Sequence, residues 1–157
     1  MIYNNVTLDT FESESDFNEI KKRLRDDLDS KYGKVFLKLD VIDFRYKRIS
    51  FSFELDSDFL FEKIYEKLKN ALGFLHINLC ENGAYIRTLV DSDSIDSAIS
   101  QINDIFEYEN NRISDSGFAI NYDLNTTNYE SGIKLEIDAT LIEPRSRAFA
   151  YEFLCKG

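Results

Sequence analysis

The chain is poor in residues that interrupt regular structure. It contains one proline, Pro144, and six scattered glycines. No stretch is rich in proline or in glycine and serine, so the sequence offers no linker at which a domain boundary would fall. A length of 157 residues suits one domain with a substantial buried core. We therefore expect residues 1–157 to form a single domain.

The residues of the commonest catalytic and metal sites are also scarce. His76 is the only histidine, and Cys80 and Cys155 are the only cysteines. Four residues along a strand separate His76 from Cys80 by about 13 Å, which is too far for a nucleophile and its base. One histidine and two distant cysteines cannot supply the donors of a zinc site. We expect no catalytic residue, no metal site and no cofactor, and we interpret both cysteines as free thiols.

Phosphate-binding loops and membrane spans are missing as well. The glycines do not form the loops that bind the phosphates of ATP or NAD. No apolar run approaches the roughly 18 residues of a membrane-spanning helix. The first residues lack the basic and apolar pattern of a secretory signal. We therefore expect a cytoplasmic protein with no membrane contact.

What the chain has in quantity is apolar and aromatic residues. They make up 43% and 14% of the sequence, which is ample for a packed core. Apolar residues recur at the helical period in three segments, residues 17–28, 61–72 and 95–106. Gly73 is placed to end the second helix. Serine–aspartate pairs that can cap the first turns are Ser15-Asp16, Ser57-Asp58 and Ser92-Asp93.

Between the helices the apolar period changes to two, which is typical of strands with one buried face. After a short N-terminal strand, the chain reads as a helix and two strands, a helix and two strands, and a helix and three strands. Asn82-Gly83 is suited to a hairpin turn, because both residues accept a positive φ angle. The alternating segments are residues 35–41, 49–55, 75–79, 84–88, 118–124, 133–141 and 149–153.

Clean alternation is typical of antiparallel sheets with one covered and one wet face. The sequence therefore predicts an α+β fold built from repeated helix-hairpin units. The expected architecture is a two-layer sandwich, with a mostly antiparallel sheet of about six to eight strands and three helices on one face. The polar partners of the alternation, among them Asp123, Glu136 and Asp138, are expected on the open face.

The net charge of −10 is concentrated in one region. Between Asp91 and Asp138 lie eleven acidic side chains against Arg112 and Lys134, so this segment carries −9 of the total. A region of one sign attracts basic surfaces and repels nucleic acid and anionic membranes. The first aspartates also suit the start of a helix, where they offset the helix dipole.

We interpret this acidic region as a docking surface for a basic protein, with no direct contact to nucleic acid. The chain is then a non-catalytic inhibitor or binding protein that blocks its partner, such as a nuclease toxin or a CRISPR-type effector. Toxin immunity proteins and phage anti-CRISPR proteins are often small and acidic, and the chain is similar to them in style without a shared motif. The expected contact residues are Asp93, Asp96, Asp104, Glu107, Glu109, Asp115, Asp123, Glu136 and Asp138.

Two other functions stay open at this stage. One is an enzyme that uses a divalent metal held by Asp91, Asp93 and Asp96, although their spacing lacks the glycine and glutamate of a calcium loop. The other is a subunit that assembles with copies of itself, or with a larger machine, through the open sheet face or a sheet edge. The sequence does not fix the oligomeric state.

Overall fold

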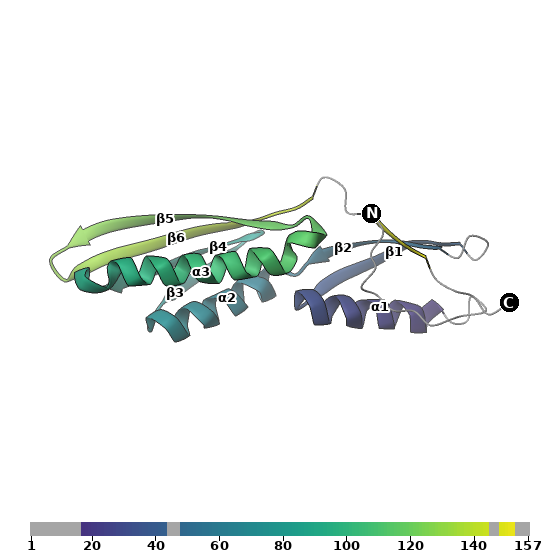
Figure 1. The fold of residues 1–157 in the computed structure, drawn as a ribbon, viewed down its shortest axis with the longest axis horizontal. Helices are drawn as coiled ribbons and strands as arrows, with labels where there is room; N and C mark the ends of the chain where they lie inside the picture. Colours follow the sequence, from purple (N-terminus) through teal and green to yellow (C-terminus); the bar gives the residue numbers. More distant parts are fainter. Residues whose placement is uncertain (1–16, 44–47, 145–147, 153–157) are drawn as a thin grey trace. The chain divides into compact units, whose positions relative to one another are not determined.

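The computed structural model describes residues 17–43, 48–144 and 148–152. In these residues it contains three α-helices and two antiparallel sheets (Figure 1). Contacts divide the chain into two compact units. Residues 1–56 and 145–157 form one, which we call the terminal unit, and residues 57–144 form the other, which we call the central unit.

The described residues of the terminal unit form one helix and a three-stranded sheet. The strand order is β1-β2-β7, so the last described strand pairs with β2. Both pairings are antiparallel, and the register of β1 on β2 shifts between Leu39 and Val41. The elements are α1 (Phe17–Tyr32), β1 (Val35–Asp43), β2 (Arg48–Leu55) and β7 (Ala148–Glu152).

Helix α1 contributes one apolar side to the core of this unit. Leu24 and Leu28, one helical turn apart, are both fully buried. Tyr32 stacks on Phe53 of β2 with ring centroids 5.4 Å apart. The connection to β1 is held by Asp29, whose carboxylate accepts a hydrogen bond from the backbone N–H of Val35 at 2.9 Å. Aromatic packing and this turn together fix α1 beside its hairpin.

The central unit contains two helices and a four-stranded antiparallel sheet. The strand order is β3-β4-β6-β5, which leaves β3 and β5 at the two edges. Short 3₁₀ turns, Ser92–Ser94 and Ser114–Ser116, flank the second helix. The elements are α2 (Ser57–Leu72), β3 (His76–Cys80), β4 (Gly83–Val90), α3 (Ile95–Ile113), β5 (Ala119–Tyr129) and β6 (Gly132–Ile142).

Helices α2 and α3 lie on one face of this sheet (Figure 1). Alternate strand residues such as Ile86 and Ile137 are buried on the helix side, together with Phe106 of α3. Phe106 stacks on Tyr122 of β5, with ring centroids 4.2 Å apart. Burying a side chain of this size contributes about 1.5–3 kcal/mol. The intervening strand residues point to the opposite face, which carries no helix of this unit.

The α+β class, the antiparallel pairing and the three helices predicted from the sequence are confirmed in the described residues. The prediction of one sheet with six to eight strands is wrong, because the strands form two sheets of three and four. Alternation identifies a strand and its buried face, but it does not record which strand becomes its neighbour. Strand β7 pairs with β2 and not with β6, so the helices are divided between two sheets. The predicted N-terminal strand lies outside the described residues.

Local predictions from turn chemistry were accurate to within a few residues. Helix α2 ends at Leu72, and Gly73 follows with a φ angle of +89°, as its position predicts. The β3–β4 turn falls on Glu81 and Asn82, one residue earlier than predicted, and Asn82 has a φ angle of +54°. Helix α3 begins only at Ile95, after the 3₁₀ turn, and no side chain caps it.

Candidate functional site

Three of the predicted contact residues lie along the solvent side of α3. Asp96, Asp104 and Glu107 are exposed. At about 100° per residue they fall within roughly 80° of one another around the helix axis, opposite the buried Ile102 and Phe106. Among the described residues, no lysine or arginine forms an ion pair with them. We call Asp96, Asp104 and Glu107 the α3 acidic stripe.

The 3₁₀ turns at the two ends of α3 hold two more of the predicted residues. Asp93 lies in the turn before the helix and Asp115 in the turn after it, and both are exposed. They extend the run of carboxylates beyond each end of the α3 acidic stripe. The stripe and its flanks therefore account for five of the nine predicted residues.

Glu109 has a different position from its neighbours on α3. Its side chain is 2% exposed and lies where α2 meets α3. One carboxylate oxygen accepts a hydrogen bond from Lys67 of α2 at 2.5 Å. The other accepts two from the guanidinium of Arg112, at 2.8 and 3.0 Å. Lys67 also lies 4.1 Å from the ring centroid of Tyr108, so it is enclosed on two sides.

These partners decide the charge of Glu109. Burial by itself raises the pKa of this carboxyl, but the hydrogen bonds and charges of Lys67 and Arg112 outweigh burial and hold the pKa below its ordinary value. Glu109 is therefore ionised and already neutralised inside the fold. It joins two helices and is not part of the exposed acidic surface that the sequence led us to expect.

The remaining three predicted residues lie on the open face of the central sheet. Asp123 of β5 and Asp138 of β6 are exposed and directly opposite each other in the register. Like charges that face each other across two strands are destabilising. The sequence alone could place both residues on one face, but only the pairing of β5 with β6 makes them neighbours.

Glu136 on the same face is partly neutralised. It accepts a hydrogen bond from the hydroxyl of Tyr85, and its other oxygen lies 3.4 Å from the ammonium of Lys134. The hydrogen bond from Tyr85, helped by the charge of Lys134, lowers the pKa of Glu136. The same hydrogen bond raises the pKa of Tyr85. Of the sheet-face acids, Asp123 and Asp138 are thus the ones without a neighbouring lysine ion pair in the described residues.

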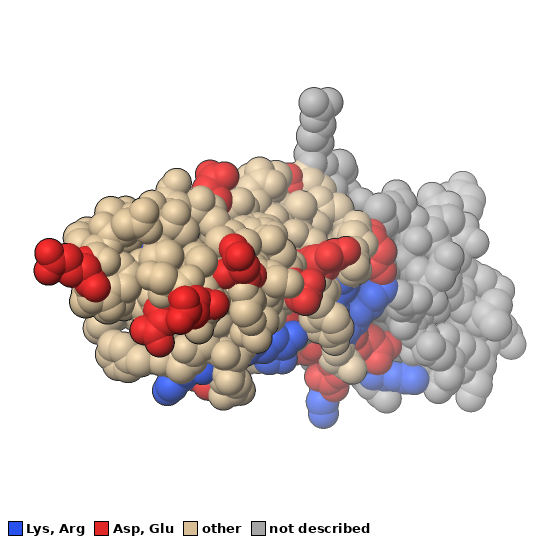
Figure 2. Space-filling view, turned by 60° about the vertical axis from the view of Figure 1, so that its left-hand side comes forward, with Lys and Arg blue, Asp and Glu red and all other residues tan. Residues whose placement is uncertain are grey.

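The predicted acidic residues do not form one patch. Those of α3 lie on the helix layer, whereas Asp123, Glu136 and Asp138 lie on the opposite face of the sheet. Figure 2 shows acidic side chains in separate groups with uncharged surface between them, and basic side chains toward the lower margin. Two acidic surfaces therefore remain on the central unit, one on each side.

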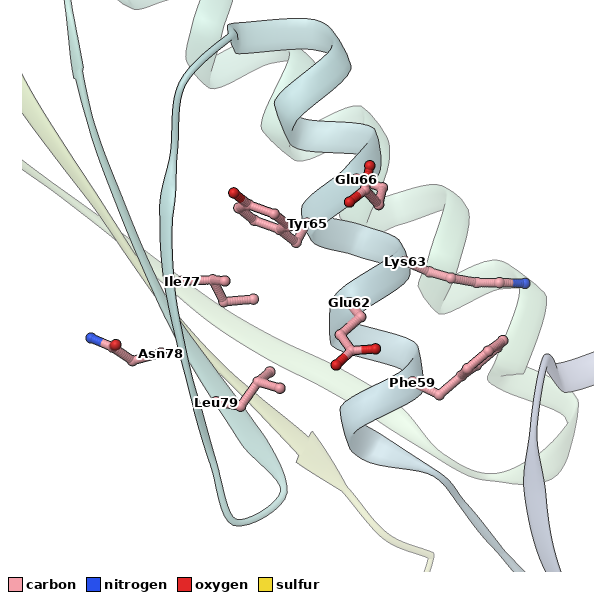
Figure 3. A pocket seen from close by; sticks show the side chains of 8 residues that line it. All are labelled: Phe59, Glu62, Lys63, Tyr65, Glu66, Ile77, Asn78 and Leu79. Carbon is pink, nitrogen blue, oxygen red and sulfur yellow. The ribbon is translucent and has the colours of Figure 1, made fainter.

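A groove that the sequence did not indicate runs between α2 and the edge strand β3. It is a hollow of about 630 Å³. Figure 3 shows Ile77 and Leu79 pointing from β3 toward the helix, Tyr65 pointing from the helix toward β3, and Asn78 pointing away. The Tyr65 hydroxyl donates a hydrogen bond to the carbonyl of Leu75 at 3.0 Å, which fixes α2 beside the start of β3.

A second hollow, of about 370 Å³, lies at one end of the open sheet face. Three of its lining residues are large, apolar and exposed: Phe74 (74%), Leu89 (54%) and Tyr129 (55%). Their spacing in the sequence gives no sign that they meet. Phe74 also packs edge-on against His76 with ring centroids 4.8 Å apart. Contiguous exposed apolar side chains of this kind mark interaction surfaces.

The residues considered from the sequence for catalysis and for metal binding can be located in the described part of the chain. His76 and Cys80 are exposed at the two ends of β3. No group of three or more His, Cys, Asp or Glu side chains in residues 17–43, 48–144 and 148–152 is arranged to hold a metal ion. Cys155 lies outside these ranges.

Comparison of the chain with protein-family models, with curated proteins and with solved structures finds no match. None of the described helices is both long and apolar enough to cross a membrane. Any function assigned to the chain therefore depends on its own surfaces.

Proposed function

We propose that the protein is a non-catalytic binding protein that docks through the acidic central unit on a basic protein and blocks it. The observation that carries the proposal is the division of charge between the two units. Residues 57–144 contain sixteen acidic and six basic side chains, a net charge of −10. The terminal unit contains thirteen of each and is neutral. The whole net charge of the chain thus belongs to one compact unit.

Such a unit sets up a field that accelerates encounter with a positively charged surface. Half of its basic side chains, Lys67, Arg112 and Lys134, are already engaged with Glu109 or Glu136. The α3 acidic stripe is consequently left to interact with an external cation or basic side chain. A surface that binds nucleic acid requires the opposite sign.

The α3 acidic stripe is also held rigidly. Helix α3 is fixed to the sheet by the stacking of Phe106 on Tyr122, and to α2 by the ion pairs of Glu109. The Tyr122 hydroxyl donates a hydrogen bond to Asn103, on the solvent side of the same helix, at 2.7 Å. A partner that binds a rigid surface does not have to order it first, which favours affinity.

On the second acidic surface, Asp123 and Asp138 favour the binding of a basic partner. Their mutual repulsion is present in the free protein and is relieved when a lysine or arginine binds between them. In the proposed inhibitor, basic groups of a nuclease or of a CRISPR-type effector meet these carboxylates in the cytoplasm. The partner then loses the basic surface that it uses for nucleic acid.

Affinity capture from the cell of origin, at low and at high salt, tests this function. The decisive variant is Asp104→Lys with Glu107→Lys, because both side chains are exposed in the middle of the stripe. Asp96 is left unchanged, since its carboxylate in the first turn stabilises the helix by offsetting the positive end of the helix dipole. We expect the wild type to retain a basic protein at low salt and to release it at high salt, and the variant to retain clearly less of it at low salt.

A matched control changes the net charge by the same amount elsewhere on the central unit. Glu81→Lys with Glu130→Lys reverses two exposed acids in hairpin turns. This control is expected to keep the partner. Equal retention by both double variants, or a retained protein that is not basic, contradicts the proposal.

A second function, assembly through the open sheet face, is favoured by the exposed Phe74, Leu89 and Tyr129. On this alternative the chain self-associates and Leu89→Asp disrupts the assembly. Leu79→Asp, an exposed leucine on the helix-facing side of the same sheet, serves as control. Sedimentation velocity distinguishes self-assembly from the inhibitor function. A monomeric wild type excludes self-assembly, whereas an oligomer that dissociates in Leu89→Asp but not in Leu79→Asp supports it.

A further inference from the structure

We propose that the groove between α2 and β3 binds an extended, basic segment of a partner protein, which pairs with β3 as an additional strand. The proposal concerns a surface other than the α3 acidic stripe. The contact is made through backbone hydrogen bonds, apolar side chains and the carboxylates of Glu62 and Glu66. None of these groups belongs to the α3 acidic stripe, so the proposal does not depend on the stripe being a docking surface.

The first argument is that β3 is an edge strand with one described neighbour. It pairs with β4 on one side, and no described backbone group bonds to its other side. Alternate residues of such a strand direct N–H and C=O groups outward. Proteins usually protect an edge with charged residues or proline. The sequence of β3, HINLC, contains neither.

The opposite edge of the same sheet is treated differently. On β5 the backbone of Ile120 is bonded by the side-chain amide of Asn110 on α3. Asn110 donates to the carbonyl of Ile120 at 3.0 Å and accepts from its N–H at 2.6 Å, as a neighbouring strand would. Further along, β5 carries the charge of Asp123. Of the two edges, β3 is therefore the one suited to accept a strand.

The second argument is the groove beside that edge. Ile77 and Leu79 belong to the helix-facing side of the sheet, yet Ile77 is only half-buried and Leu79 is 39% exposed. A strand added next to β3 would place its own alternate side chains against them and against Tyr65. Recognition by strand addition uses this combination, with main-chain bonds for affinity and side-chain pockets for specificity.

Charge decides which segment fits. The α2 wall of the groove carries the exposed carboxylates of Glu62 and Glu66. The lysine in the same wall, Lys63, points away and lies 4.9 Å from the ring centroid of Phe59. An incoming segment with lysine or arginine between its apolar residues would find partners for both kinds of side chain.

A second copy of the chain fits this groove less well. Pairing two β3 strands edge to edge would bring Glu62 and Glu66 of each copy toward those of the other. The central units also repel each other, since each carries a net charge of −10. We therefore assign the groove to a basic segment of a different protein.

The test uses the full chain and a phage-displayed library of random peptides as the probe. We expect selected peptides to alternate apolar with other residues and to contain lysine or arginine. The selected peptides are then synthesised and their affinity for the protein is measured. Leu79→Lys, which places a cation against the bound segment, is expected to lower this affinity at least about tenfold. Leu89→Lys changes an exposed leucine on the other face of the sheet and is expected to leave their affinity unchanged.

Amide hydrogen exchange of the peptide complex reports on the backbone pairing. Alternate amides of His76–Cys80 should become protected, whereas a side-chain contact alone would leave them unchanged. Glu62→Lys with Glu66→Lys should also lower the affinity for basic peptides about tenfold, although this variant leaves the apolar contacts in place.

Three results overturn the proposal: no enriched peptide, equal binding to wild type and Leu79→Lys, or binding without protection of β3. A dimer of the free chain that protects β3 and dissociates in Leu79→Lys assigns the groove to a second copy and also overturns it. Reversal of Asp104 and Glu107 should not change peptide affinity more than Glu81→Lys with Glu130→Lys does. The experiments therefore distinguish failure of the groove proposal from failure of the proposal that the α3 acidic stripe is a docking surface.

Discussion

Glu109 shows how one residue can belong to the charge pattern of a sequence and not to its surface. It lies two positions from Glu107 in the sequence, but the helical period directs its side chain toward α2, where it forms an ion pair with Lys67. Ion pairs with partly exposed partners contribute little by themselves, but an unpaired charge left behind in such a site is costly. The network of Glu109, Lys67 and Arg112 is therefore important mainly when one member is removed.

Glu109→Gln is expected to lower the free energy of unfolding at neutral pH by about 1 to 3 kcal/mol, because Lys67 and Arg112 lose an ionised partner. The folded pKa of Glu109 lies below its unfolded value of about 4.3. Its stabilisation is therefore present above that value and disappears as the pH falls through the folded pKa. Urea unfolding at several pH values measures both effects.

Glu107→Gln is the control for this prediction, since it makes the same change on the exposed side of α3. It is expected to alter stability by no more than about 0.5 kcal/mol. The assignment is contradicted if Glu109→Gln changes the free energy of unfolding as little as Glu107→Gln does. It is also contradicted if Glu109→Gln keeps the full pH dependence of the wild type's stability below about pH 4.

Asn110 is the residue whose function at the sheet edge is easiest to isolate. Asn110→Ala removes two hydrogen bonds to the backbone of Ile120, at a cost of about 1 kcal/mol each. The exchange rate of the Ile120 amide should rise more than those of its neighbours on β5. Asn111→Ala, at the exposed position that follows, should leave that rate as it is. An unchanged Ile120 amide would mean that Asn110 does not protect this edge.

At the scale of elements, the three helices could be predicted because the apolar period of each is long and regular. The strands could be predicted for the same reason, and so could the end of α2 at Gly73. The partition into two sheets could not, because it depends on β7 returning to β2 over a long sequence separation. Tertiary pairing of this kind leaves no local pattern.

The same limit explains what the sequence missed at the candidate sites. The opposition of Asp123 and Asp138 follows from the register of β5 on β6. The groove follows from the place of β3 at the edge of its sheet. A signal was present in β3 itself, since its sequence contains no charged residue or proline, two of the features that protect sheet edges. That signal becomes informative only once the strand order is known.

At the scale of the whole molecule, the uneven charge of the sequence coincides with a structural boundary. The acidic region recognised from Asp91 to Asp138 lies inside the central unit, and the remainder of that unit adds one further negative charge. The terminal unit contributes no net charge, so it neither adds to nor screens the field in a first approximation. The prediction of a single domain stays a prediction, to be tested by whether the two units unfold in one transition.

The salt dependence of binding to the captured basic partner tests the central claim most directly. Affinity should fall steeply as salt rises for the wild type and for Glu81→Lys with Glu130→Lys. For Asp104→Lys with Glu107→Lys the affinity should be lower at low salt and the dependence on salt flatter. Identical affinities and slopes for the two double variants would contradict the assignment of the α3 acidic stripe as the docking surface.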